Sequence, residues 1–405
     1  MKGLNVLKRF LIACSLTFGL LHADALEKIL SENQESVFEY DVTSNALQSE
    51  KLSNSWINPV RVEYSKNYST QMGNDHIGTG TFTVRINQPI FRFGGIYFGV
   101  KYAKASQALN HSKIMLQRRQ RIGDAVKVLF NMQKNRWEQK RLTYLLKNDL
   151  LDIKQKREHY QSGLLDSSFL DQALLKKSQD EAALLESQIR QVEFENQFAN
   201  LSDKNPMKLS LPRFKFVNKK MYEKKHLASK IERENVELAQ YNEKVVLTKY
   251  LPTISLQGQY SDGDLNPLFA SPNSLLKEQY YTYGFSISMP IDFNALRDIE
   301  ISKVAKLQAQ IRAVEQNDVA SREYDGVAKS VALIEKKIAL AKANEKLYRK
   351  LYTLTKDLEG AGEKTALDVA TMQHSLEIKK IDRKIYEIDK QLYLLKLYIG
   401  MENVL

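Results

Sequence analysis

The sequence predicts a mainly α-helical protein with a smaller β component, built from a duplicated unit of two amphipathic strands followed by a long helical hairpin. Two proline-free stretches support this fold: the 116 residues between Pro89 and Pro206, and the 115 residues after Pro290. Because proline interrupts helix interiors, such stretches can hold very long helices. Each stretch follows an alternating, strand-like run, and Pro89 and Pro290 lie 201 positions apart.

The composition agrees with long helices that have narrow apolar seams. Charged residues make up 27% of the chain and hydrophobic residues 43%, with a mean hydropathy of −0.42. The net charge of +12 could indicate nucleic-acid binding. Basic residues are nevertheless dispersed among acidic ones, so we interpret them as solvated helix faces and expect no nucleic-acid partner.

Residues 1–23 are interpreted as a signal peptide, with a basic start and a 12-residue apolar run over 10–21. The only cysteine, Cys14, lies inside this run, and Leu11-Ile12-Ala13-Cys14 resembles a lipoprotein cleavage box. Only four apolar residues separate Arg9 from Cys14, and the apolar run continues beyond it. Cleavage after Ala23 is therefore preferred, and lipidation of Cys14 stays open.

After a predicted helix over about 24–55, four runs of about ten residues alternate with period two, near 60–69, 81–90, 253–261 and 282–289. Each run has one apolar and one polar face. Polar loops over 71–80 and 262–279 join the runs into two hairpins. The apolar faces comprise Val60, Val62, Tyr64 and Tyr68; Phe82, Val84, Ile86 and Ile90; Ile254, Leu256 and Tyr260; and Tyr283, Phe285, Ile287 and Met289.

Long helical regions follow each predicted β-hairpin, over about 95–201 with a break near 161–163 and over about 294–399 with a break near 359–362. The longer arms of about 65 residues would approach 100 Å. Apolar seams step by three and four residues, and a second stripe indicates that each helix meets more than one neighbour. The seams comprise Val327, Val331, Ile334, Ile338 and Ala341; Ile378, Ile381, Ile385, Ile388, Leu392, Leu395 and Ile399; Leu347, Leu351, Leu354 and Leu358; and Leu185, Ile189 and Val192.

These elements divide the chain into a first repeat over 24–201, a connector over 202–224 and a second repeat over 225–405. The connector carries Pro206, Pro212 and a cluster of lysines. Each repeat would contain a helix, two strands and a helical hairpin.

The apolar outer faces of the strands indicate membrane β-structure. About ten tilted residues cover the roughly 25 Å apolar band of an outer membrane, and Tyr64, Tyr68, Tyr260 and Tyr283 suit the membrane interface. Four strands are too few to close a barrel, and an open sheet edge in lipid leaves backbone groups unpaired. A closed barrel would therefore need several chains.

The order of elements, with a short motif at each helical turn, resembles the TolC-like outer-membrane efflux protein family over essentially the whole mature chain. The second turn contains Gly362-Glu363-Lys364-Thr365-Ala366-Leu367-Asp368-Val369, and the first contains Gly163-Leu164-Leu165-Asp166-Ser167-Ser168-Phe169-Leu170. The resemblance implies a homotrimer with a 12-stranded β-barrel continuous with an α-helical barrel. It also implies docking onto a periplasmic adaptor (membrane fusion) protein that is bound to an inner-membrane transporter.

The resemblance also implies roles for residues at the two turns. Gly163, Leu164 and Gly362 would lie at the adaptor-docking tips. Asp368 would line the periplasmic entrance as a ring of carboxylates that favours cations, and Lys364 matches a basic position that latches the entrance in some members.

Two positions depart from the family pattern. Phe169 replaces the first-repeat counterpart of Asp368, and Thr371 replaces a second entrance acid. We therefore expect an entrance gate held differently, with more apolar closure and with Asp166 partly replacing the lost carboxylate.

Alternatives from other classes are a periplasmic coiled-coil adaptor or scaffold of an export complex, an enzyme, and a nucleic-acid binder on a helical scaffold. An adaptor has one helical hairpin between small β domains, whereas this pattern is duplicated; extraction without detergent would favour the adaptor. The sequence contains no phosphate-binding loop, nucleophile elbow, paired catalytic acids or metal-like histidine spacing. We expect a non-enzyme without cofactor or metal that conducts passively, with outer-membrane lipid around its barrel.

Overall fold

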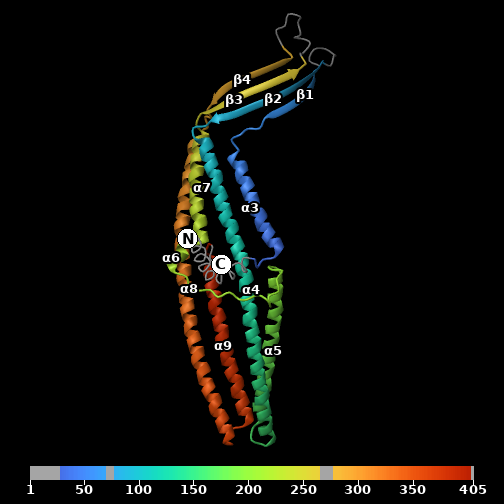
Figure 1. Ribbon diagram of the computed structural model, residues 1–405, viewed down its shortest axis with the longest axis vertical. Coiled ribbons are helices and arrows are strands. Elements are labelled where there is room, and N and C mark those ends of the chain that lie inside the picture. Colours follow the sequence, from blue (N-terminus) through green and yellow to red (C-terminus); the bar gives the residue numbers. More distant parts are fainter. Residues whose placement is uncertain (1–27, 70–76, 265–276, 403–405) are drawn as a thin grey trace, which may run out of the picture. The chain divides into compact units, whose positions relative to one another are not determined.

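The computed structural model describes residues 28–69, 77–264 and 277–402. The predicted signal peptide, Cys14 and most of both predicted polar loops lie outside these residues. Figure 1 shows the described elements. In chain order they are α3 Glu32–Ser53, β1 Arg61–Ser69, β2 Ile77–Phe91, α4 Gly95–Gln161, α5 Ser167–Ala199, α6 Lys219–Lys225, α7 Leu227–Lys249, β3 Thr253–Gly263, β4 Gln279–Ser288, α8 Ala295–Gly360 and α9 Ala366–Ile399.

The predicted combination of long helices and four strands is confirmed. The long arms α4 and α8 have 67 and 66 residues, and the shorter arms α5 and α9 have 33 and 34. The helix breaks fall at the predicted turns. No described helix has both the length and the apolar character needed to cross a membrane.

The chain forms two compact units, which are described separately. The helical unit contains described residues 28–39, 114–228 and 317–402, and the strand unit contains described residues 40–69, 77–113, 229–264 and 277–316. Each unit therefore combines segments from both halves of the sequence.

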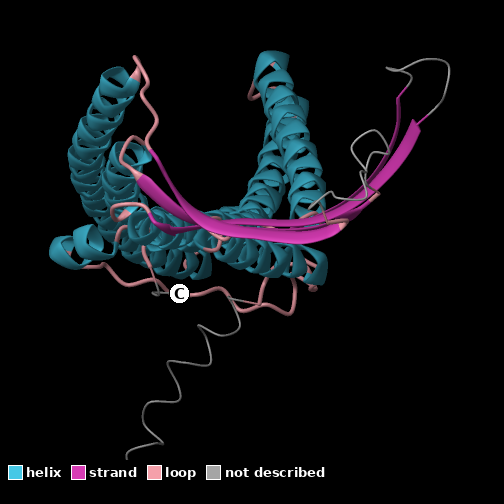
Figure 2. Ribbon diagram, turned by 90° about the horizontal axis from the view of Figure 1, so that it is seen from above, coloured by secondary structure: helices cyan, strands magenta, loops and turns pink. Residues whose placement is uncertain are grey.

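In the strand unit, one antiparallel sheet has the order β1-β2-β3-β4. The two predicted hairpins are present, and the pairing of β2 with β3 joins them. The β2–β3 register shifts between Pro89 and Phe91, where proline cannot donate to the ladder. Figure 2 shows that the sheet is strongly curved.

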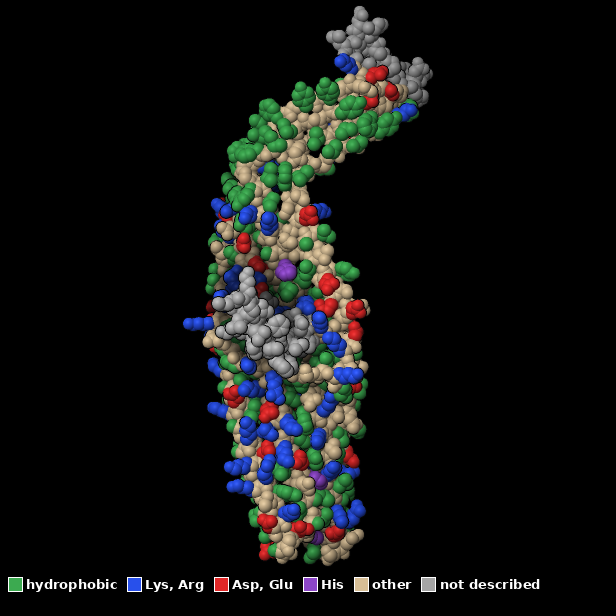
Figure 3. Space-filling model, viewed as in Figure 1, with side chains coloured by type: hydrophobic (Ala, Val, Ile, Leu, Met, Phe, Trp, Pro, Cys, Tyr) green, Lys and Arg blue, Asp and Glu red, His purple; other side chains and the backbone are tan. Residues whose placement is uncertain are grey.

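The register places the apolar faces of all four strands on the same side of the sheet. Tyr64 pairs with Phe82, and Leu256 pairs with Phe285; directly opposite residues share a face. This face is open to solvent in the single chain: Phe285 is 72% exposed and Tyr283 81% exposed. Figure 3 shows hydrophobic side chains gathered over the strands.

The prediction of a helix from residue 24 is wrong for the described residues 28–31. The helix begins at Glu32 instead, directly after Ser31, whose carbonyl accepts from the Glu35 amide at 3.0 Å and whose amide donates to the Leu201 carbonyl at 3.0 Å. Ile29 and Leu30 are buried in the core of the helical unit, only 1% and 4% exposed. Packing of these two side chains therefore overrides the helical periodicity.

In the helical unit, the long helices pack in the order α5, α4, α9, α8. Asn135 of α4 donates to the Ser187 carbonyl of α5 at 2.8 Å, and Lys134 of α4 pairs with Asp389 of α9 at 2.8 Å. Arg383 of α9 pairs with Glu345 of α8 at 3.1 Å. Most of the predicted seam of α9 is buried, with Leu392 and Ile399 half-buried. In the predicted seam of α8, Val331, Ile334 and Ala341 are buried, and Val327 and Ile338 are half-buried.

Two other predicted seams are not fully covered within the chain. Leu185, Ile189 and Val192 of α5 are exposed, as are Leu347 and Leu354 of α8, while Leu351 and Leu358 are half-buried. Because α5 and α8 are the outermost helices of the packed row, these stripes have no helix of the same chain to meet. Their apolar periodicity is real, but the expected contact is absent from the single chain.

The connector crosses this row of helices. The Phe214 amide donates to Gln391 Oε1 of α9 at 2.7 Å, and the Tyr324 hydroxyl of α8 donates to the Val217 carbonyl at 2.7 Å. Part of the predicted connector is helical, since α6 covers Lys219–Lys225. The next helix, α7, begins at Leu227, two residues later than predicted, after the isolated bridge between His226 and Met401.

Gly123 of α4 marks a close approach of α4 to the end of α9. An added Cβ would lie 2.3 Å from Ile399 Cδ1 and 2.4 Å from Cγ1. We expect Gly123→Ala to lower the free energy of unfolding by about 1–3 kcal/mol through overpacking, measured by thermal or chemical unfolding.

Gly326→Ala is the matched control, because Gly326 is in α8 with nothing within 4 Å of an added Cβ. Alanine there should be neutral or stabilise by up to about 1 kcal/mol through helix propensity. Equal effects of the two changes would contradict a close α4–α9 contact at Gly123.

Candidate functional site

The two helical turns that the sequence singled out have the same backbone construction. Gly163 and Gly362 have φ values of +74° and +81°, in the left-handed region that favours glycine. In each turn, the amide of the following residue donates to a carbonyl five residues earlier: Leu164 to His159 at 2.8 Å, and Glu363 to Leu358 at 2.9 Å. This is the Schellman pattern that ends a helix.

In each turn the residue that caps the next helix lies three residues after the glycine, but the two caps differ. Asp166 caps α5, and its Oδ1 accepts from the Ser168 amide at 2.9 Å. Thr365 caps α9 in a reciprocal capping box: the Asp368 amide donates to Thr365 Oγ1 at 3.2 Å, and the Thr365 amide donates to Asp368 Oδ2 at 3.0 Å. Phe169 and Asp368 occupy the same position, three residues after the cap.

The capping hydrogen bonds lower the pKa values of the two carboxylates, Asp368 and Asp166. The amide and hydroxyl of Thr365, with a further contribution from Lys364, hold the pKa of Asp368 below its usual value. The Ser168 amide likewise lowers the pKa of Asp166. Asp166 is exposed and Asp368 is half-buried, and both are helix-start acids that remain ionised at neutral pH.

The other predicted site residues lie at or near the same turns. Leu164 is 72% exposed and Phe169 is 46% exposed. Thr371 is half-buried one turn further along α9, where its carbonyl accepts from the Ser375 hydroxyl at 2.8 Å. Among the described residues, no hydrogen bond joins Phe169 or Thr371 to Asp368, so their part in a gate stays a prediction.

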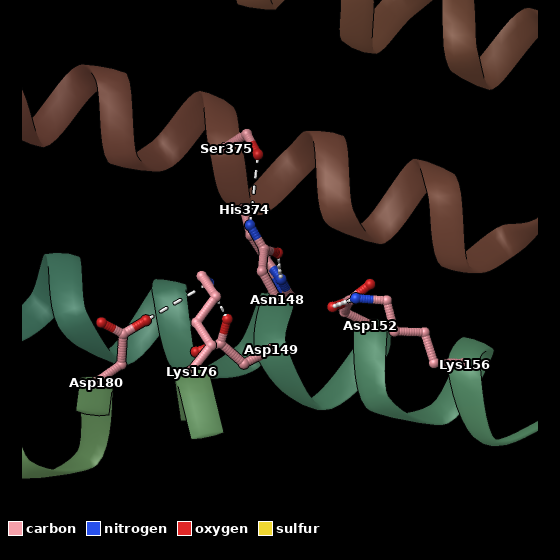
Figure 4. A network of polar contacts seen from close by, with 8 residues as sticks. All are labelled: Asn148, Asp149, Asp152, Lys156, Lys176, Asp180, His374 and Ser375. Atoms are coloured by element: carbon pink, nitrogen blue, oxygen red, sulfur yellow. Dashed lines mark hydrogen bonds and ion pairs between the residues drawn. The ribbon is translucent and has the colours of Figure 1, made fainter. Parts of the chain in front are cut away.

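A polar cluster that the sequence reasoning missed lies behind the first turn (Figure 4). Asp149 of α4 is only 3% exposed, and its Oδ1 accepts from the Lys176 ammonium of α5. Lys176 also lies 3.6 Å from Asp180. Asp149 Oδ2 is buried without a hydrogen-bond partner in the described structure.

Burial raises the pKa of Asp149, although the charge of Lys176 opposes this shift. Burial alone would lower the pKa of Lys176, but its hydrogen bond to Asp149 raises it overall. Burial therefore matters more for Asp149 than for Lys176, because the Asp149 carboxylate is buried whereas the Lys176 side chain is largely exposed.

A second contact in the same cluster joins α4 to α9 and hence one helical hairpin to the other. His374 Nδ1 lies 2.9 Å from Asn148 Oδ1, and Asn148 Nδ2 donates to the Ser375 hydroxyl at 3.4 Å. Burial and then the charge of Lys147 lower the pKa of His374. In its neutral form His374 can donate from Nδ1 to Asn148 Oδ1 while Asn148 Nδ2 donates to Ser375.

Part of this cluster could have been found from the sequence. Asp149 precedes Gly163 by 14 residues and Lys176 follows it by 13, so a helical hairpin that turns at Gly163 places them at the same level. Asn148 and His374 belong to different hairpins, and spacing gives no register between those. Within residues 28–69, 77–264 and 277–402, no group of three or more metal-type ligands is present.

Comparison with known proteins shows similarity in structure but not in sequence. No family model matches the chain, and no curated protein matches its sequence. The Campylobacter jejuni outer membrane channel CmeC has a TM-score of 0.74 and 15% identity, covering 95% of this chain and 87% of that one. The Vibrio cholerae outer membrane protein VceC has a TM-score of 0.70 and 13% sequence identity, covering 90% of this chain and 92% of that one.

The Neisseria gonorrhoeae outer membrane channel MtrE, in its open state, has a TM-score of 0.71 and 12% sequence identity, covering 93% of this chain and 88% of that one. The chain therefore has the TolC-like fold of outer-membrane channels, over nearly its whole length. The resemblance inferred from the order of elements and the two turns is confirmed at the level of the fold.

The Asp149–Lys176 pair predicts an asymmetric response to substitution. Lys176→Ala leaves a buried carboxylate without its cation and should lower the free energy of unfolding by about 1–3 kcal/mol at pH 7. Asp149→Asn removes the buried charge, while Lys176 keeps Asp180, so the cost should be below about 1 kcal/mol. Thermal unfolding of the two variants measures both effects.

The loss in Lys176→Ala should shrink as the pH falls from 7 towards 5. A carboxyl whose folded-state pKa is raised stabilises the fold below that pKa and loses the contribution as the pH rises through it. Lys177→Ala, which breaks only the exposed pair with Glu181, is the control and should cost little. Equal losses for Lys176→Ala and Lys177→Ala would contradict a buried, Lys176-dependent Asp149.

Proposed function

We propose that this protein is the outer-membrane channel of a tripartite efflux or type I secretion system. It would conduct substrates passively from an inner-membrane pump across the periplasm and the outer membrane. The observation that carries the proposal is the solvent-exposed apolar face shared by all four strands, which suits lipid and is costly in water. The structural likeness to outer membrane channels supports it.

We propose that three copies assemble. The sheet has free edges at β1 and β4, where backbone groups would lack partners in lipid. Three curved four-stranded sheets joined edge to edge would form one 12-stranded barrel and pair those edges. The polar faces of the strands, with Ser255, Gln257 and Gln259 on β3, would then line its interior.

The same assembly would cover the apolar stripes of the helices. Leu185 and Ile189 on α5 and Leu347 and Leu354 on α8 lie at the two ends of the packed row of helices. Contact between α8 of one copy and α5 of the next would bury both stripes and close a helical barrel. This barrel would lie in the periplasm, and residues 1–23 would direct export.

At the entrance, Gly163, Leu164 and Gly362 would form the tips that dock onto a periplasmic adaptor protein. Asp368 would contribute one carboxylate per copy to the pore, with Lys364 beside it. Phe169 and Thr371 would give a gate with fewer acids than in the family pattern. The Asn148–His374 contact supports a gate in which the two hairpins of one chain are held together behind the tips.

The likeness to channel proteins also supports a non-enzymatic role. The energy for transport would come from the inner-membrane transporter. Copurification of that transporter would identify the class of substrate, which can be a drug, a metal ion or a protein.

Assembly can be tested through the exposed stripe of α8. We expect the double change Leu347→Glu, Leu354→Glu to convert a detergent-solubilised trimer into monomers, because each copy would bury two carboxylates at the α8–α5 contact. The measurement is the molar mass of the complex by light scattering. Lys356→Glu, exposed on the opposite face of the same helix, is the control; a trimer that survives the double change would contradict this interface.

The entrance can be tested by planar-bilayer recording, in which the wild type should show a small, mostly closed conductance blocked by multivalent cations. Asp368→Asn removes the charge but keeps an oxygen that can accept from the Thr365 amide, whereas Asp368→Ala also removes the cap, at about 1 kcal/mol. Block should weaken in both variants if the carboxylate acts through its charge. Loss of block in Asp368→Ala alone would assign the effect to helix capping, and unchanged block in both would remove Asp368 from the pore.

A further inference from the structure

A groove lies in the helical unit where the connector crosses α4, α8 and α9. Its cavity volume is about 730 Å³, which is in the range of sites for small organic ligands. Trp137 of α4, Arg213 of the connector, Lys342 of α8 and Lys384 of α9 all line it. None of these residues belongs to the turns or the exposed stripes on which the proposed channel depends.

The groove has an unbalanced positive charge. Its lining includes four cations and a single carboxylate. Lys390 already pairs with Glu335 at 2.6 Å, and the carboxylate, Glu387, lies 3.6 Å from Arg383. In the described part of the chain, no carboxylate forms an ion pair with Arg213, Lys342 or Lys384, so these three cations can accept an anion from outside.

The groove also has an apolar wall. The Lys384 ammonium lies 3.9 Å from the centroid of the Trp137 ring, so its charge is held against an aromatic face. Leu211 and Ile338 line the same cavity. An apolar surface next to unpaired cations suits a ligand that carries both an anionic group and an apolar body.

The groove keeps its shape through contacts that Phe214 of the connector makes with α4 and α9. The Phe214 amide donates to Gln391 at 2.7 Å, and the Phe214 ring lies 4.7 Å from the Tyr398 ring and 6.2 Å from the Phe130 ring. Phe214 is itself buried. These contacts fix the neighbouring residue, Arg213, over the helices without any ligand, so binding would require little ordering of the connector.

We propose that this groove binds a small amphiphilic organic anion. A sulfonate, carboxylate or phosphate group would be held by Arg213, Lys342 and Lys384, and the apolar body would contact Trp137, Leu211 and Ile338. The groove shares no residue with the two turns, the exposed stripes or the sheet face on which the proposed function depends, so its proposal does not depend on that function. Charge-assisted hydrogen bonds from these three cations would make the groove prefer an anionic ligand over a neutral one of the same shape.

Trp137 supplies a fluorescence reporter. The chain has two tryptophans, Trp56 and Trp137, so Trp56→Phe leaves one emitter in the groove. The full-length protein with this change, in a non-ionic detergent, would be titrated with 5-dimethylaminonaphthalene-1-sulfonate, which accepts energy from tryptophan. The uncharged 1-sulfonamide of the same ring system is the matched neutral probe. Saturable quenching of Trp137 by the sulfonate, and much weaker quenching by the sulfonamide, is the expected result.

In the same background, the double change Lys342→Gln, Lys384→Gln should raise the Kd of the sulfonate about tenfold or more. Lys350→Gln on α8 is the control and should leave the Kd unchanged. Equal affinity for the charged and neutral probes, equal effects of the double change and of Lys350→Gln, or no saturable quenching would each overturn the proposal. Circular dichroism confirms that the variants keep their helices, and Arg213→Gln tests the connector without altering either helix.

Discussion

The apolar seam along α9 is the interaction on which the helical unit depends. Ile381 and Leu395 are only 2% exposed, because α9 lies between α4 and α8 and meets both. Helices of this length bring many apolar residues to each face, and only a helix with a neighbour on both sides can cover them. The outer faces of α5 and α8 have no such neighbour in the chain, and their exposed leucines follow directly from the packing order.

The sheet follows the same principle with different geometry. Pairing of β2 with β3 joins the two hairpins, and the register adds their apolar faces into one exposed surface. A single helix or strand with an exposed stripe would mean little. Here the uncovered surfaces lie at both ends of the helix row and over a whole sheet face, and the proposed assembly would cover them with further copies and with lipid.

Polar side chains then determine how the two helical turns are capped and how neighbouring helices are linked behind them. The two turns share a glycine-dependent backbone but differ in chemistry, since Thr365 and Asp368 form a reciprocal box while Asp166 caps alone. Behind the turns, Asp149 and Asn148 link α4 to both of its neighbours. The connector adds contacts of a different kind, which hold cations and an aromatic ring around an open groove.

The sequence by itself determined the element types, the lengths of the helices, the two turns and the apolar face of each strand, because these depend on local periodicity, proline and glycine. The equivalence of Phe169 and Asp368 could also be predicted, since the two turns have the same spacing. Tertiary structure alone decided which stripes are covered, that Ile29 and Leu30 are core rather than helix, and that Asn148 meets His374. The groove at Arg213, Lys342 and Lys384 could not be predicted from the sequence either. Such contacts join residues far apart in the chain, and their register is set by side-chain packing between helices, which no local pattern encodes.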